Sequence, residues 1–214
     1  MNENPDNDDD QPQPQMSVGL AAGFYGFLVL VGWGILQAAG DMSLFVWHDR
    51  HDVAPWLGAL MGVGVGLGFV AVSQVLDRYS EWAQELGREF GKIFGELRVE
   101  QVLILAVASG IGEEAFFRGC LQQVLTEVAF SGAWAEWIAL TVTSVGFGLL
   151  HIGPDFRKFF PWTIMAVAFG FVFGGMYLYT GDLLAPIVAH FTINFFNIMA
   201  ISQKYGVPEG ESTP

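Results

Sequence analysis

Residues Val99–Leu121 read VEQVLILAVASGIGEEAFFRGCL, and this segment governs the fold that the rest of the chain can adopt. Its length suits one passage through a bilayer, because a hydrocarbon core about 30 Å thick needs roughly 20 apolar residues in a helix. The segment nevertheless carries Glu113, Glu114 and Arg118. Even the milder insertion scales give a cost of about 2.5–3.5 kcal/mol for one ionised group at that depth. We therefore expect these side chains to be paired or to do chemistry.

Helix geometry separates the three charged side chains. Glu114 and Arg118 lie four residues apart on one face, so they are predicted to form a structural ion pair. Glu113 lies about 100° further round the helix, without a partner in its own turn. One glutamate is thus interpreted as structural and the other as free to act. The alternative is that all three only brace the bundle.

The sequence on either side repeats the apolar pattern. Of the 214 residues, 52% are hydrophobic and 14% are charged, whereas soluble domains carry about 25% charged residues. The sequence therefore predicts an all-α, polytopic transmembrane bundle with about six spans. These spans are Val18–Gly40, Pro55–Leu76, Val99–Leu121 with an extension towards Phe130, Ala133–Leu150, Phe160–Tyr179 and Leu183–Ser202.

The segment Asp77–Glu100, between the second and third spans, differs from the spans in how its apolar and charged residues alternate. Apolar residues recur there at spacings of three and four, and charged residues fill the other face. This pattern predicts an interfacial amphipathic helix on the membrane surface. The alternative is a solvated helix packed on the protein's own loops.

Glycines recur in the second span, where no strand precedes them and a nucleotide-binding loop is disfavoured. We interpret them as small residues that allow two helices to pack closely. They are Gly58, Gly62, Gly64, Gly66 and Gly68.

The charges predict how the chain is placed. Residues 1–15 are acidic and contain prolines, which predicts a disordered acidic tail. Residues 16–204 then form the membrane domain, and residues 205–214 form a short tail. With the N-terminus inside, only Arg50 lies on the outer side, which favours a multi-pass protein of the plasma (inner) membrane with both termini cytoplasmic. The inner bases are Arg78, Arg88, Lys92, Arg98, Arg157, Lys158 and Lys204.

The bulk composition also limits the partners. With nine lysines and arginines in all, clustered contacts to phosphates are lacking and no nucleic acid is expected as a partner. Cys120 is the single cysteine, so an intrachain disulfide and a cysteine-rich metal site are excluded. The sequence does not specify an oligomeric state.

Polar side chains also occur in two later spans. His151 ends the fourth span, and His190 and Asn194 share one face of the sixth. Together with Glu113 they predict a functional polar cluster, although a single histidine in an apolar helix is more often a satisfied core residue.

Such a cluster suits hydrolysis. A glutamate held away from bulk water is a stronger base towards a reacting water. Paired donors at His190 and Asn194 are suited to stabilise an oxyanion. Glu113, His151 and His190 could equally ligate a divalent metal such as Zn²⁺ and leave one position open for water. The residues leave both chemistries open.

The order of these motifs resembles a known family. It consists of Glu-Glu-x-x-x-Arg ending at Arg118, Phe-x-x-x-His ending at His151 and His-x-x-x-Asn ending at Asn194. This arrangement is similar to the CAAX-processing and bacteriocin-processing intramembrane proteases, which include the type II CAAX prenyl endopeptidases. The resemblance covers residues 99–202, and the first two spans match only in general character.

The resemblance implies an intramembrane endopeptidase that acts in the lipid bilayer on a membrane-anchored protein or peptide. It implies that Glu113 and His151 activate water and that His190 and Asn194 form the oxyanion site. It assigns Glu114 and Arg118 to organising the helix. The family is labelled as metalloproteases, but a metal-free glutamate mechanism has also been argued, so the resemblance leaves the metal open.

Two functions of other classes remain as alternatives. A proton-coupled transporter would also use buried glutamate and histidine. A non-enzymatic immunity or scaffold protein would keep the fold and act by binding. His48 and His51, with Asp49 and Asp52, lie at metal-ligand spacing in the first outer loop, but we interpret that loop as flexible and interfacial.

Overall fold

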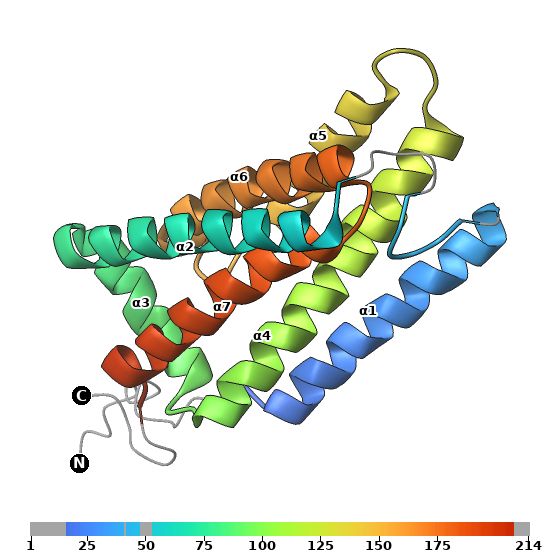
Figure 1. The fold of residues 1–214 in the computed structure, drawn as a ribbon. Helices are drawn as coiled ribbons and strands as arrows, with labels where there is room; N and C mark the ends of the chain where they lie inside the picture. Colours follow the sequence, from blue (N-terminus) through green and yellow to red (C-terminus); the bar gives the residue numbers. More distant parts are fainter. Residues whose placement is uncertain (1–15, 41, 48–52, 208–214) are drawn as a thin grey trace, which may run out of the picture.

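The computed structural model describes residues 16–40, 42–47 and 53–207, and the described residues form a helical bundle (Figure 1). This confirms the all-α prediction. The elements in chain order are α1 (Val18–Ala39), α2 (Pro55–Tyr79), α3 (Glu81–Phe94), α4 (Val99–Glu114), the π-helical segments η2 (Ala115–Gln122) and η3 (Leu125–Ala129), α5 (Ala135–Leu149), α6 (Phe156–Thr180) and α7 (Leu184–Tyr205).

Several sequence predictions lie outside the described residues. They are the acidic tail 1–15, the end of the C-terminal tail from residue 208, and the loop that contains His48, Asp49, Arg50, His51 and Asp52.

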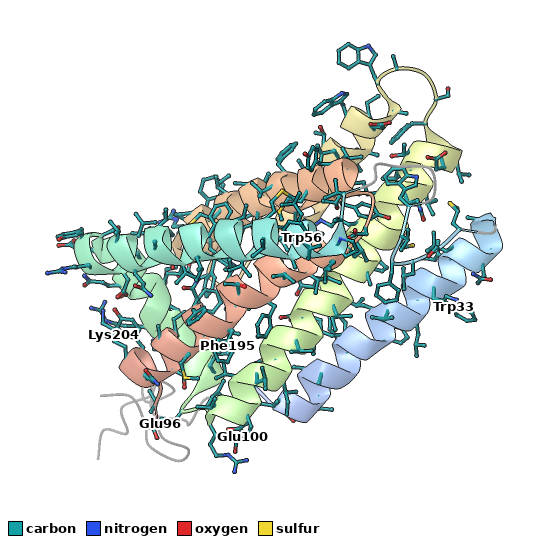
Figure 2. The ribbon with its side chains drawn as sticks, in the orientation of Figure 1. Trp33, Trp56, Glu96, Glu100, Phe195 and Lys204 are labelled. Carbon is teal, nitrogen blue, oxygen red and sulfur yellow. The ribbon has the colours of Figure 1, made fainter. Side chains whose placement is uncertain are left out.

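Within the described part of the chain, four helices are long and apolar enough to cross a membrane, namely α1, α2, α6 and α7. Their outer surfaces carry large exposed apolar side chains, such as Trp33 at 56% exposure. In Figure 2, Trp33 lies on the outer side of α1, whereas Glu96, Glu100 and Lys204 gather at one end of the bundle. Apolar flanks with charges at an end are the arrangement of an integral membrane protein.

The other two predicted spans are the third and the fourth. The third is confirmed with its extension, because α4 continues through η2 and η3 to Ala129, one residue before Phe130. The fourth, predicted as Ala133–Leu150, forms a helix of 15 residues, which at 1.5 Å per residue measures about 22 Å and is shorter than a bilayer core. Helix α6 begins at Phe156 rather than Phe160, because Asp155 caps it by accepting from the backbone of Arg157.

Helix α3 is amphipathic, and it is shorter than the predicted range Asp77–Glu100. It lies across one end of the bundle, against α2, α6 and α7 (Figure 1). The Phe90 ring packs edge-on against Phe159 and Trp162, both at 5.5 Å between ring centroids. The apolar side of α3 therefore packs on the protein's own helices, and its place at the membrane surface stays a prediction.

Charge pairs also tie α3 to the start of α6. Lys158 Nζ lies 2.9 Å from Glu89 Oε1 and 3.4 Å from Glu85 Oε1. Burial of the Glu89 carboxylate acts to raise its pKa, but hydrogen bonds from Lys158 and Lys92 outweigh burial and hold the pKa below its ordinary value.

Helix α7 lies between α2 and α4, and α1 lies on the other side of α4 (Figure 1). The contact of α2 with α7 depends on three of the five glycines, because Gly58, Gly62 and Gly66 are buried. A Cβ atom at position 66 would lie 2.6 Å from Thr192 Cβ. At positions 64 and 68 it would meet no described atom within 4 Å. Gly58, Gly62 and Gly66 are four residues apart, so they form one helix face without side chains. This face packs closely against α7, the helix that carries His190.

We expect Gly66→Ala to lower the unfolding midpoint in detergent, because the added methyl overpacks the contact, at a cost of about 1–3 kcal/mol. Gly68→Ala is the matched control, and its midpoint should equal or exceed the native value, because the site is open and alanine favours a helix over glycine. Equal midpoints for the two variants would contradict the close contact of α2 with α7.

Candidate active site

The polar residues predicted from the sequence come together from four parts of the chain. Glu113 and Glu114 end α4, and Arg118 follows in η2. His190 and Asn194 lie on α7. His151 follows α5 by two residues, in a turn rather than in the helix itself.

Glu114 and Arg118 form a buried ion pair. Their side chains are 0% and 1% exposed, and Arg118 Nη1 lies 3.0 Å from Glu114 Oε1. Arg118 Nη2 also donates to the backbone oxygen of Gly170 on α6, at 3.3 Å. The guanidinium lies over the Phe147 ring, 4.5 Å from its centroid, where the ring face attracts a cation. One charge pair thus connects η2 with α5 and α6.

The same carboxylate holds His190. His190 Nδ1 lies 2.8 Å from Glu114 Oε1, and the imidazole stacks on the Phe173 ring at 5.2 Å. With Nδ1 engaged, Nε2 points towards Glu113, 3.9 Å from its Oε2 atom.

His151 is held in a similar way by its own turn. Its Nδ1 lies 2.7 Å from the backbone oxygen of Phe147, and its ring contacts Trp162 of α6 at 5.9 Å between centroids. Its Nε2 lies 3.8 Å from Glu113 Oε2. Two histidines from different elements therefore face one oxygen of one glutamate.

These contacts assign the histidine tautomers. A backbone oxygen and a carboxylate oxygen can only accept, so the proton of each neutral ring is on Nδ1. Each Nε2 then presents a lone pair. Glu113 Oε2 is buried and has no hydrogen-bond partner among the described atoms. Three acceptors converge there at separations too long for direct hydrogen bonds, which suits a water that donates to two of them.

Asn194 is oriented by a residue that the sequence patterns did not single out. Its Nδ2 donates to Ser109 Oγ at 2.8 Å, and the Ser109 hydroxyl donates to the backbone oxygen of Ala106. An amide nitrogen carries two N–H groups, so one remains for another acceptor. Ser109 precedes Glu113 by four residues on one helix face, and this spacing is a signal that could have identified it.

A cavity of about 320 Å³ adjoins these side chains. Glu113, His151, His190 and Asn194 line one part of it, and residues of α2, α3 and the end of α7 line the rest. Most of the lining is apolar, so the cavity suits an extended apolar segment of a ligand. Tyr25 of α1 also lines it.

Glu113, His151 and His190, the three predicted metal ligands, lie further apart than the ligands of a zinc ion. Two ligand atoms on one tetrahedral zinc lie about 3.3–3.6 Å apart when each bond is about 2.0–2.2 Å. Both Nε2 atoms are further than this from Glu113 Oε2, at 3.8 and 3.9 Å. In the described residues, no group of three or more His, Cys, Asp or Glu side chains is placed to hold a metal ion. The residue types suit zinc, and the two separations from Glu113 Oε2 are wider than those between ligands of one zinc ion.

Comparisons with known proteins identify relatives of this chain. Residues 96–196 match the family model described as type II CAAX prenyl endopeptidase Rce1-like. The chain is 30% identical over 172 residues to the uncharacterized protein YpbD of Bacillus subtilis (strain 168), a match that covers 75% of this chain and 80% of the relative. No solved structure matches it significantly. The matched residues 96–196 include all six site residues that were predicted from the sequence.

The wide spacing predicts that the purified protein carries well below one zinc per chain. Metal analysis by mass spectrometry of native protein, prepared without chelators, measures this directly. His190→Ala is the comparison variant, and its zinc content should equal that of the native protein. One zinc per native chain that is lost from His190→Ala would contradict the prediction and restore the metal interpretation.

Proposed function

Because this chain belongs to the type II CAAX prenyl endopeptidase Rce1-like family, we propose that it is an intramembrane endopeptidase that hydrolyses a peptide bond of a membrane-anchored protein or peptide. The observation that supports this most is the convergence of two histidine Nε2 atoms on one oxygen of Glu113. Such an arrangement is suited to holding and activating a water molecule.

In the proposed reaction, Glu113 Oε2 takes a proton from the water. The Nε2 lone pair of His151 accepts the second water hydrogen bond and orients the molecule. The water oxygen then attacks the carbonyl carbon of the peptide bond, and the proton on Glu113 passes to the leaving amine. Each histidine is fixed through Nδ1, so neither needs to reorient during attack.

The developing oxyanion would lie against Asn194 and His190. The second N–H of Asn194 is free to donate, and Ser109 fixes the plane of the amide. The neutral ring of His190 presents a lone pair at Nε2, so His190 would donate there only after taking up a proton from solvent, while its Nδ1 stays on Glu114. Donors that are held in place before reaction stabilise the oxyanion without reorganisation, and one such donor is worth about 10²–10³ in rate.

The substrate would enter along the cavity beneath α3. Leu86 and Phe90 of α3 and Ile198 and Ile201 of α7 line that part, so an apolar segment of the substrate is favoured there. The charged end of the bundle is also the α3 end (Figure 2). With the positive-inside rule, this supports N- and C-termini in the cytoplasm of a plasma (inner) membrane protein and access from that side.

We expect Glu113→Gln to lower the rate of cleavage by at least about 10²-fold, because the amide cannot take the proton from water. The measurement compares peptide termini in membranes from cells that carry native protein or Glu113→Gln. Glu100→Gln is the control, because its side chain is exposed beside Arg98 and distant from the cavity. New termini near membrane anchors should be present with native protein and Glu100→Gln and absent with Glu113→Gln.

Identical termini in all three samples, at equal protein levels, would contradict the protease proposal. Ion flux into liposomes that Glu113→Gln abolishes would then favour a transporter. A cellular phenotype that Glu113→Gln retains would favour a binding protein.

A further inference from the structure

We infer that Tyr25 of α1 is a positioning residue for hydrolysis, because it lines the same cavity as Glu113 and comes from a helix outside the matched residues 96–196. The inference rests on the proposed function and adds a residue to its site. It also gives α1, which otherwise packs on the edge of the bundle, a part in the chemistry.

Helix α1 runs alongside α4 (Figure 1), and the two helices are in close contact at Gly112, the residue before Glu113. A Cβ atom at position 112 would lie 2.7 Å from Tyr25 Cβ and 2.8 Å from Tyr25 O. Any side chain at Gly112 would therefore push the two helices apart. Because Gly112 directly precedes Glu113, this contact places the backbone of Tyr25 next to the residue that carries the carboxylate.

The side chain of Tyr25 turns inward, unlike its neighbours on α1. Phe24 and Phe27 are 56% and 59% exposed on the outer surface, whereas Tyr25 lines the cavity together with Glu113. In this proposal the Tyr25 hydroxyl is a hydrogen-bond donor to the Glu113 carboxylate, its neighbour in the cavity. A phenol can donate to a carboxylate, and an isolated hydroxyl inside an apolar membrane helix needs such an acceptor.

This contact restrains the carboxylate without blocking its reactive oxygen. Glu113 Oε2 has no hydrogen-bond partner in the described residues, so a Tyr25 hydroxyl that donates to Oε1 would leave Oε2 to water and the two histidines. Without the hydroxyl, the carboxylate is free to rotate about its side-chain bonds. Oε2 would then spend less time between the two Nε2 atoms, and small errors of placement lower reaction rates strongly.

The test is Tyr25→Phe, which keeps the ring and removes only the oxygen. We expect kcat to fall about ten- to a hundredfold, with KM within about twofold of native, because the residue acts on the base rather than on the substrate. The probe is a peptide that spans a cleavage site found by the comparison of membrane termini. Tyr79→Phe makes the same change on a tyrosine that is 75% exposed and should leave both constants unchanged.

A native kcat in Tyr25→Phe, or a rise in KM alone, would overturn the inference while leaving the protease proposal intact. A second measurement does not depend on activity. Unfolding midpoints of native protein, Tyr25→Phe, Glu113→Ala and the double variant form a double-mutant cycle. We expect Tyr25→Phe to shift the midpoint by a different amount when Glu113 is absent. If Tyr25→Phe shifts the midpoint equally in both backgrounds, the inferred contact between Tyr25 and Glu113 is wrong, whatever the outcome of the cleavage assays.

Discussion

The ion pair between Glu114 and Arg118 is the interaction on which the rest of the site depends. Both side chains are buried, so neither charge can be left alone without a cost of about 3–5 kcal/mol. The pair is joined to three other elements through Gly170, the Phe147 ring and His190. A strong local constraint in one helix thereby fixes how α5, α6 and α7 meet it.

The same constraint divides the work between two adjacent glutamates. Glu114 is occupied by Arg118 and His190, which stabilises the structure but removes its carboxylate from any reaction. Glu113 points into the cavity, where two histidines face it. The Glu113 carboxylate can act only if the side chains around it are held in place. Glu114 holds one of them, because it fixes the orientation of the His190 ring. The change to π-helical turns directly after Glu114 fits this assignment, since such turns are frequent at functional sites.

Much of this arrangement follows from sequence pattern. Spacing in the helix separated Glu113 from Glu114, and apolar runs located the four long spans. Other features depend on tertiary packing and could not be predicted. The spacing of Gly58, Gly62 and Gly66 suggests a packed face, but nothing in it shows that α7 is the partner. Tyr25 looked like any aromatic residue in an apolar helix, because its role depends on Gly112 of a different span. The shortness of α5 and the inward face of α3 are likewise set by neighbouring helices.

The division between the two glutamates is tested most directly by the unfolding midpoints of purified Glu113→Gln and Glu114→Gln in the same detergent. Glu114→Gln leaves the buried guanidinium of Arg118 without its counter-charge, so its midpoint should fall well below native. Glu113→Gln removes a charge whose buried oxygen has no hydrogen-bond partner within the described structure, so its midpoint should equal or exceed native. If Glu113→Gln unfolds at as low a temperature as Glu114→Gln, both carboxylates are structural and the account of this site is wrong.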